Sequence, residues 1–78
     1  MNLKQARATK NFNQHDLALL TGINQTKISL FERGYVHPNH EELVAISSAL
    51  DVNPSELVFI ERRALLNQLV LETRSRRP

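Results

Sequence analysis

The feature that most constrains the fold of this chain is a helix-start signal that recurs along it. Asparagine stands ahead of a helix-compatible stretch at five places, which are Asn2, Asn13, Asn24, Asn39 and Asn53. Asparagine is a favoured N-cap because its side-chain oxygen accepts a hydrogen bond from a backbone N–H of the first helical turn. No segment alternates apolar and polar residues as a half-buried strand would. The sequence therefore predicts an all-α fold of five helices with short connections.

The residues that follow the predicted helices suit a helix exit. Gly22 and Gly34 come after the second and third helices, and glycine tolerates the left-handed conformation found at many helix ends. The first helix is expected to end near Thr9, and the fifth begins at Pro54. We expect residues 1–60 to form one domain and residues 61–78 to add a C-terminal helix and a basic tail. The fourth helix carries an apolar stripe at helical spacing, which consists of Leu43, Ile46 and Leu50.

Composition excludes several classes of function. With 78 residues, the chain is long enough for one small domain but too short for a deep catalytic cleft. It has no cysteine, which excludes disulfides and thiolate zinc sites and fits a reducing cytoplasm. Its longest apolar runs are four residues, far short of a membrane span. It has no nucleophile motif and no phosphate-binding loop, so we expect no enzyme activity and no cofactor. The histidines, which lack metal-ligand spacing, are His15, His37 and His40.

The charges are distributed unevenly along the chain. Residues 1–37 carry five Lys or Arg against two acidic residues, whereas residues 38–60 carry four acidic residues and no Lys or Arg. Residues 61–78 are basic again, with five Arg against two acidic residues. A basic front and an acidic back suit a domain that turns one face toward a polyanion.

The segment from Asn13 to Gly34 has the pattern of two short helices that cross at a tight turn. The expected turn consists of Thr21, Gly22 and Ile23. The small side chain of Ala18, in the first of the two helices, allows close packing near the crossing. On the helix after the turn, Ile28 and Phe31 point one way. The residues that point the other way are Gln25, Thr26, Ser29, Leu30 and Arg33. Short polar groups along such a face are typical of a helix that reads base edges in a major groove.

With these landmarks in order, the chain from Leu3 to Leu57 resembles the phage repressor and Cro-type helix-turn-helix family. The matching segments are residues 3–7, 13–18, 21–29, 31–34, Pro38 and residues 49–57. The resemblance implies double-stranded DNA as partner and a homodimer that acts as a transcriptional regulator, specifically a repressor, on a palindromic operator. It implies base contacts by Gln25, Thr26, Ser29 and Leu30. It implies phosphate contacts by Lys10, Asn13, Gln14, Lys27, Arg33 and His37. It also implies an ion pair between Arg7 and Glu32 that joins the first helix to the third.

The sequence departs from the family pattern at a few positions. Asn11 stands where glycine is common, and asparagine also tolerates the left-handed conformation. Leu19 and Leu20 are apolar where the family is polar, Thr21 is polar where it is apolar, and Leu30 is apolar within the base-facing stripe. Two alternatives stay open, an antitoxin of a toxin–antitoxin pair and a protein-interaction module on the same fold. In an antitoxin, Leu19, Leu20 or the apolar residues at 65–70 would bind the toxin. RNA polymerase is another candidate protein partner.

The C-terminal segment leaves two interpretations open. Its apolar residues are Leu65, Leu66, Leu69 and Val70. This stripe either covers the core of its own domain or forms the seam of a dimer. A dimer is attractive because a single helix-turn-helix contacts few bases.

Overall fold

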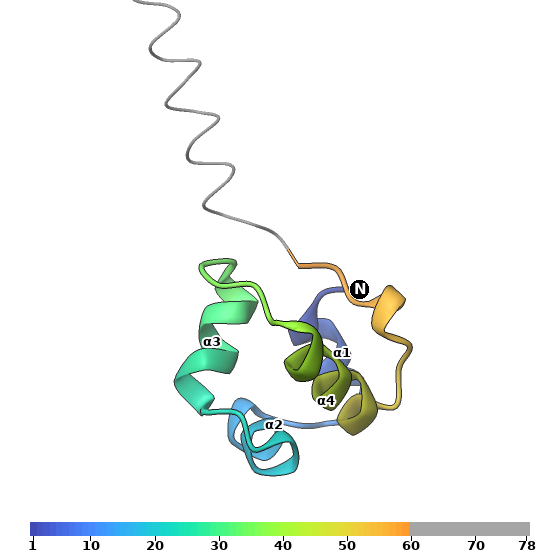
Figure 1. Ribbon diagram of the computed structural model, residues 1–78. Coiled ribbons are helices and arrows are strands. Elements are labelled where there is room, and N and C mark those ends of the chain that lie inside the picture. The colour runs from blue at the N-terminus through green and yellow to red at the C-terminus, as the bar shows by residue number, and fades with distance from the viewer. Residues whose placement is uncertain (60–78) are drawn as a thin grey trace, which may run out of the picture.

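The computed structural model describes residues 1–59, which form four α-helices and one short 3-10 turn (Figure 1). The elements are α1 (Leu3–Thr9), α2 (Gln14–Thr21), α3 (Gln25–Arg33), α4 (His40–Leu50) and η1 (Pro54–Glu56). No strand occurs in this part of the chain, and the predicted all-α architecture is confirmed for it. The interpretations of residues 61–78 as a helix, tail or dimer seam lie outside the described residues.

Asparagine side chains start every one of these elements, as the sequence predicts. Asn2, Asn13, Asn39 and Asn53 each form a reciprocal capping box with the third residue of the helix. Asn24 caps α3 more simply, because its side chain accepts a hydrogen bond from the N–H of Thr26. These caps satisfy backbone N–H groups that have no partner inside the helix. The short helices therefore begin at positions fixed by local chemistry.

A left-handed residue lies at or just after the end of each of the four α-helices. Gly22 closes α2 with φ of 73°, and Gly34 closes α3 with φ of 79°. Asn11, just after α1, has φ of 59°, so asparagine does take the conformation expected where the family has glycine. Asp51 ends α4 in the same region, with φ of 54°. The turn at Gly22 lets α3 pack on α2, and the turn at Asp51 lets η1 pack on α4.

The predicted fifth helix is not confirmed, because residues 53–59 contain only a short 3-10 turn. The capped start at Asn53 is present, but only the three residues of η1 follow it, and Leu57 is already extended. The backbone here finds partners at the other end of the domain. The N–H of Val58 donates to the carbonyl of Met1 at 2.8 Å, and the ammonium group of Met1 donates to the carbonyl of Glu56 at 2.9 Å. These bonds to residue 1 compete with the hydrogen bonds that would continue a helix.

The core gathers apolar side chains from all four helices. Helix α2 contacts both α3 and α4, and α1 packs on α3. Ser47 is the buried polar residue of this part of the chain, and its hydroxyl donates to the carbonyl of Leu43 at 2.7 Å. The buried apolar residues are Leu3, Ala6, Leu17, Ile28, Phe31, Ile46, Leu50 and Leu57. This packing holds α3 by one face and leaves its other face to solvent.

Candidate nucleic-acid interface

The outer face of α3 carries the side chains expected to contact bases. Gln25 and Thr26 are exposed in the first turn of the helix, whereas Ser29 and Leu30 are half-buried. The side chains of Gln25 and Thr26 make no hydrogen bond to any residue between 1 and 59. Their polar groups are therefore available to a ligand that approaches α3 from outside. Leu30 offers only part of its apolar surface.

The start of α2 holds two of the residues expected to contact phosphate. Asn13 is committed to its cap, because its side-chain oxygen accepts from the N–H of Asp16 at 2.8 Å and its own N–H donates to the Asp16 carboxylate at 3.0 Å. The side-chain amide of Gln14 reaches toward Glu32, at a long 3.4 Å. Helix geometry leaves the first N–H groups of α2 without partners inside the helix. An anion can bind to these N–H groups and to the side-chain NH₂ group of Asn13, which the cap does not use.

Arg7 and Glu32 form a bidentate ion pair between α1 and α3. The two distances are 2.7 Å from Nε to Oε2 and 2.8 Å from Nη2 to Oε1, and Nη1 of Arg7 also donates to the carbonyl of Phe12 at 2.8 Å. The side chains of Arg7 and Glu32 are only 11% and 7% exposed. The hydrogen bond to Glu32 raises the pKa of Arg7 against the opposing effect of burial. The pair therefore fixes the second half of α3 to α1.

Lys27 lies in an ion pair that the sequence did not indicate. Its Nζ is 2.6 Å from Oε2 of Glu42, near the start of α4. This hydrogen bond, together with one from the backbone N–H of Asn39, lowers the pKa of Glu42. No spacing rule links positions 27 and 42, because they lie on separate helices. The capping pattern places Glu42 at the start of α4, but only the folded structure brings Lys27 to it.

The other expected phosphate contacts lie at the surface. Lys10 is 3.9 Å from the exposed carboxylate of Asp51, a loose pair. Arg33 lies over the ring of Tyr35, with 5.5 Å from its guanidinium carbon to the ring centroid. His37 stands edge-on to the ring of Phe59, and its Nδ1 is 3.0 Å from the carbonyl of Pro38. Lys10 and Arg33 are exposed at the surface, whereas the ring of His37 also packs against Phe59 in the stretch after η1.

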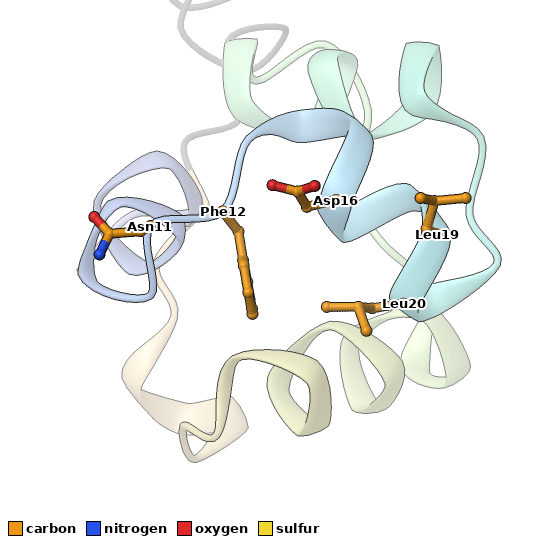
Figure 2. A pocket seen from close by; sticks show the side chains of 5 residues that line it. All are labelled: Asn11, Phe12, Asp16, Leu19 and Leu20. Atoms are coloured by element: carbon orange, nitrogen blue, oxygen red, sulfur yellow. The ribbon is translucent and has the colours of Figure 1, made fainter.

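A second surface lies on α2, beside its link to α1. A hollow of about 420 Å³ is lined by Asn11, Phe12, Asp16, Leu19 and Leu20. Figure 2 shows Phe12 and Leu20 pointing into it. Leu19 and Leu20 are 71% and 58% exposed, so the apolar patch suggested by the departures from the family pattern is present.

The polar residue at the end of α2 is accommodated locally. The hydroxyl of Thr21 donates to the carbonyl of Leu17 at 2.7 Å and accepts from the N–H of Ile23. Hydrogen bonds of the Thr21 hydroxyl within the turn thereby take the place of the apolar packing expected at this position.

Within residues 1–59, no group of three or more His, Asp or Glu side chains is placed to hold a metal ion. None of the helices in that range is long and apolar enough to cross a membrane.

A family model described as helix-turn-helix matches residues 3–57, from the start of α1 to the residue after η1. Comparison with curated proteins gives no match, and comparison with solved structures gives none. The matched span contains α2, the Gly22 turn and α3 in full.

Proposed function

Because the chain belongs to the helix-turn-helix family whose model matches residues 3–57, we propose that it is a transcriptional regulator that reads a palindromic operator as a homodimer. DNA binding and regulation of transcription follow from the family. The finer proposal is that α3 enters the major groove of each half-site and that binding represses transcription.

The observation that carries this proposal is the outer face of α3. Gln25 is exposed in its first turn with an unengaged side-chain amide, next to the exposed Thr26. An amide of this kind forms two hydrogen bonds with N6 and N7 of adenine in a major groove. Ser29 and Leu30 lie one turn further along, where the methyl groups of Leu30 suit the methyl group of thymine.

On this proposal, affinity comes from groups elsewhere on the surface. Lys10, Arg33 and His37 lie at the surface, and the start of α2 offers N–H groups with Asn13 and Gln14. Phosphate contacts of this type fix the register of the protein on the duplex and release counterions, so affinity falls as salt rises. In a homodimer the two copies of α3 lie about 34 Å apart, which places half-site centres about 10 bp apart.

Selection of bound duplexes from a random DNA pool tests the proposal. A palindromic sequence with half-sites about one helical turn apart should be enriched, and its affinity should fall steeply with salt. Gln25→Ala should cost about 1–3 kcal/mol at one base position. Ser48→Ala, on an exposed position of α4, is the matched control and should change nothing. A pool without enrichment would contradict the proposal.

The apolar surface at Leu19 and Leu20 favours a second candidate, in which the chain also binds a protein. This second function could take three forms: an antitoxin that regulates its own operon, a regulator that contacts RNA polymerase, or a protein-interaction module. Leu20→Ser should then abolish binding to a partner protein encoded by a neighbouring gene and leave DNA affinity unchanged. If Gln25→Ala has no effect on DNA and Leu20→Ser abolishes partner binding, the protein-interaction function replaces DNA reading.

A further inference from the structure

The recognition helix is held by ion pairs on both sides. Helix α3 has its main packing contacts with α2 and α1. Near its second half, Glu32 pairs with Arg7 of α1, and near its first half Lys27 pairs with Glu42 of α4 at 2.6 Å. The side chain of Glu42 is only 14% exposed, and its Oε1 accepts from the backbone N–H of Asn39 at 3.0 Å. The hydrogen bond from Asn39 therefore orients the Glu42 carboxylate independently of Lys27.

The positions of these residues around α3 separate the two ion pairs from the outer face. Successive residues of a helix are turned by about 100°. On that count, Gln25, Ser29 and Thr26 lie within one arc, and the buried Ile28 and Phe31 lie opposite. Lys27 and Glu32 flank the buried side chains, one on each side. Lys27 thus lies beside the core-facing stripe and reaches toward α4.

We propose that Lys27 does not contact phosphate but is a positioning residue. Its ion pair with Glu42 holds the first turn of α3 at a fixed angle. This inference rests on the proposed DNA-reading function. The first turn carries Gln25 and Thr26, so its orientation decides whether their polar groups meet the base edges. A phosphate contact and a positioning pair predict different effects of the same substitutions.

Glu42→Gln separates the two roles. Glutamine also serves at the third position of a capping box, so the start of α4 keeps its hydrogen bonds while the charge is lost. Glu41→Gln is the matched control, because Glu41 is exposed on the same turn, carries the same charge and has no ion pair among residues 1–59. Any general effect of removing one negative charge on DNA affinity appears in both variants.

The measurement is the ratio of affinities of the full chain for the enriched duplex and for a shuffled duplex of the same length. Glu42→Gln and Lys27→Gln should each lower this ratio about two- to fivefold, the range of a partly exposed ion pair. The double variant should lower it no further, Lys27→Arg should retain it, and Glu41→Gln should leave it unchanged. Unfolding by urea establishes that each variant is folded at the assay temperature.

The opposite pattern overturns the inference. If Lys27 contacts phosphate, Lys27→Gln weakens both duplexes equally, leaves the ratio unchanged and reduces the salt slope by about one. Glu42→Gln then frees Lys27 and tightens binding more than Glu41→Gln does. A wild-type chain that enriches no duplex contradicts the proposed function and this inference together. A wild-type chain that discriminates, with variants that leave the ratio unchanged, contradicts the inference alone.

Discussion

Arg7→Met should destabilise the domain strongly, because it leaves the Glu32 carboxylate without its main partner. The substitution removes both bonds to Glu32 and the bond to the carbonyl of Phe12. The Glu32 side chain, 7% exposed, would then keep only the long contact with Gln14. Removing one partner of a buried pair costs about 3–5 kcal/mol, and the residual exposure favours a loss of about 3 kcal/mol. Methionine fills a similar volume, so lost packing contributes little.

This loss is large against the stability of a chain of this size. A chain of 78 residues has a free energy of unfolding of about 4–12 kcal/mol. A loss of about 3 kcal/mol corresponds to a fall in Tm of about 12–24 °C. Urea unfolding followed by circular dichroism at the helix band measures it, since the chain has no tryptophan and one tyrosine.

A matched control and a double variant make this prediction refutable. Lys10→Met removes the loose pair with Asp51, whose side chain is 92% exposed, and should change the free energy of unfolding by less than about 0.5 kcal/mol. Arg7→Met combined with Glu32→Leu should recover part of the loss, because no unpaired charge remains. If Arg7→Met costs under about 1 kcal/mol, or if the double variant loses the sum of both single losses, the reasoning is wrong.

Three further predictions concern single positions. Asp51→Gly should raise the free energy of unfolding by up to about 1 kcal/mol in urea, because glycine adopts the left-handed φ of 54° without strain; a decrease would contradict this. Leu17→Ala should cost about 2–5 kcal/mol because Leu17 is fully buried, whereas Leu19→Ser should cost under about 0.5 kcal/mol in the same assay. Because the pKa of Glu42 is lowered in the folded state, Glu42 stabilises the fold at pH values above the ordinary glutamate pKa, and this stabilisation is lost as the pH falls through the lowered pKa. NMR titration should show that Lys27→Gln moves the pKa of Glu42 upward.

The helix starts and most helix ends could be predicted from the sequence because their causes are local. The bond from Asp16 N–H to the side chain of Asn13 joins residues three positions apart, and the left-handed φ of Asn11 and Gly22 depends on the residue itself. Such interactions need no knowledge of the rest of the fold. The family model over residues 3–57 confirms the resemblance built on the same landmarks.

The features that the sequence did not predict share a different cause, which is contact between distant segments. The signal at Asn53 starts a helix correctly, but whether the helix continues depends on Met1, whose carbonyl accepts from the N–H of Val58. The pair of Lys27 with Glu42 likewise depends on the angle between α3 and α4. Sequence spacing within one helix gives no information about either contact.

The hydrogen bonds between residue 1 and residues 56 and 58 have a consequence for how the domain opens. They close a loop that contains nearly all of the described chain, and such a contact lowers chain entropy more than any local turn does. They do not take part in the packing of α2 against α3. We expect this contact to open more often than α2 and α3 separate, so that amide hydrogen exchange at Val58 should be faster than exchange in the core of α3.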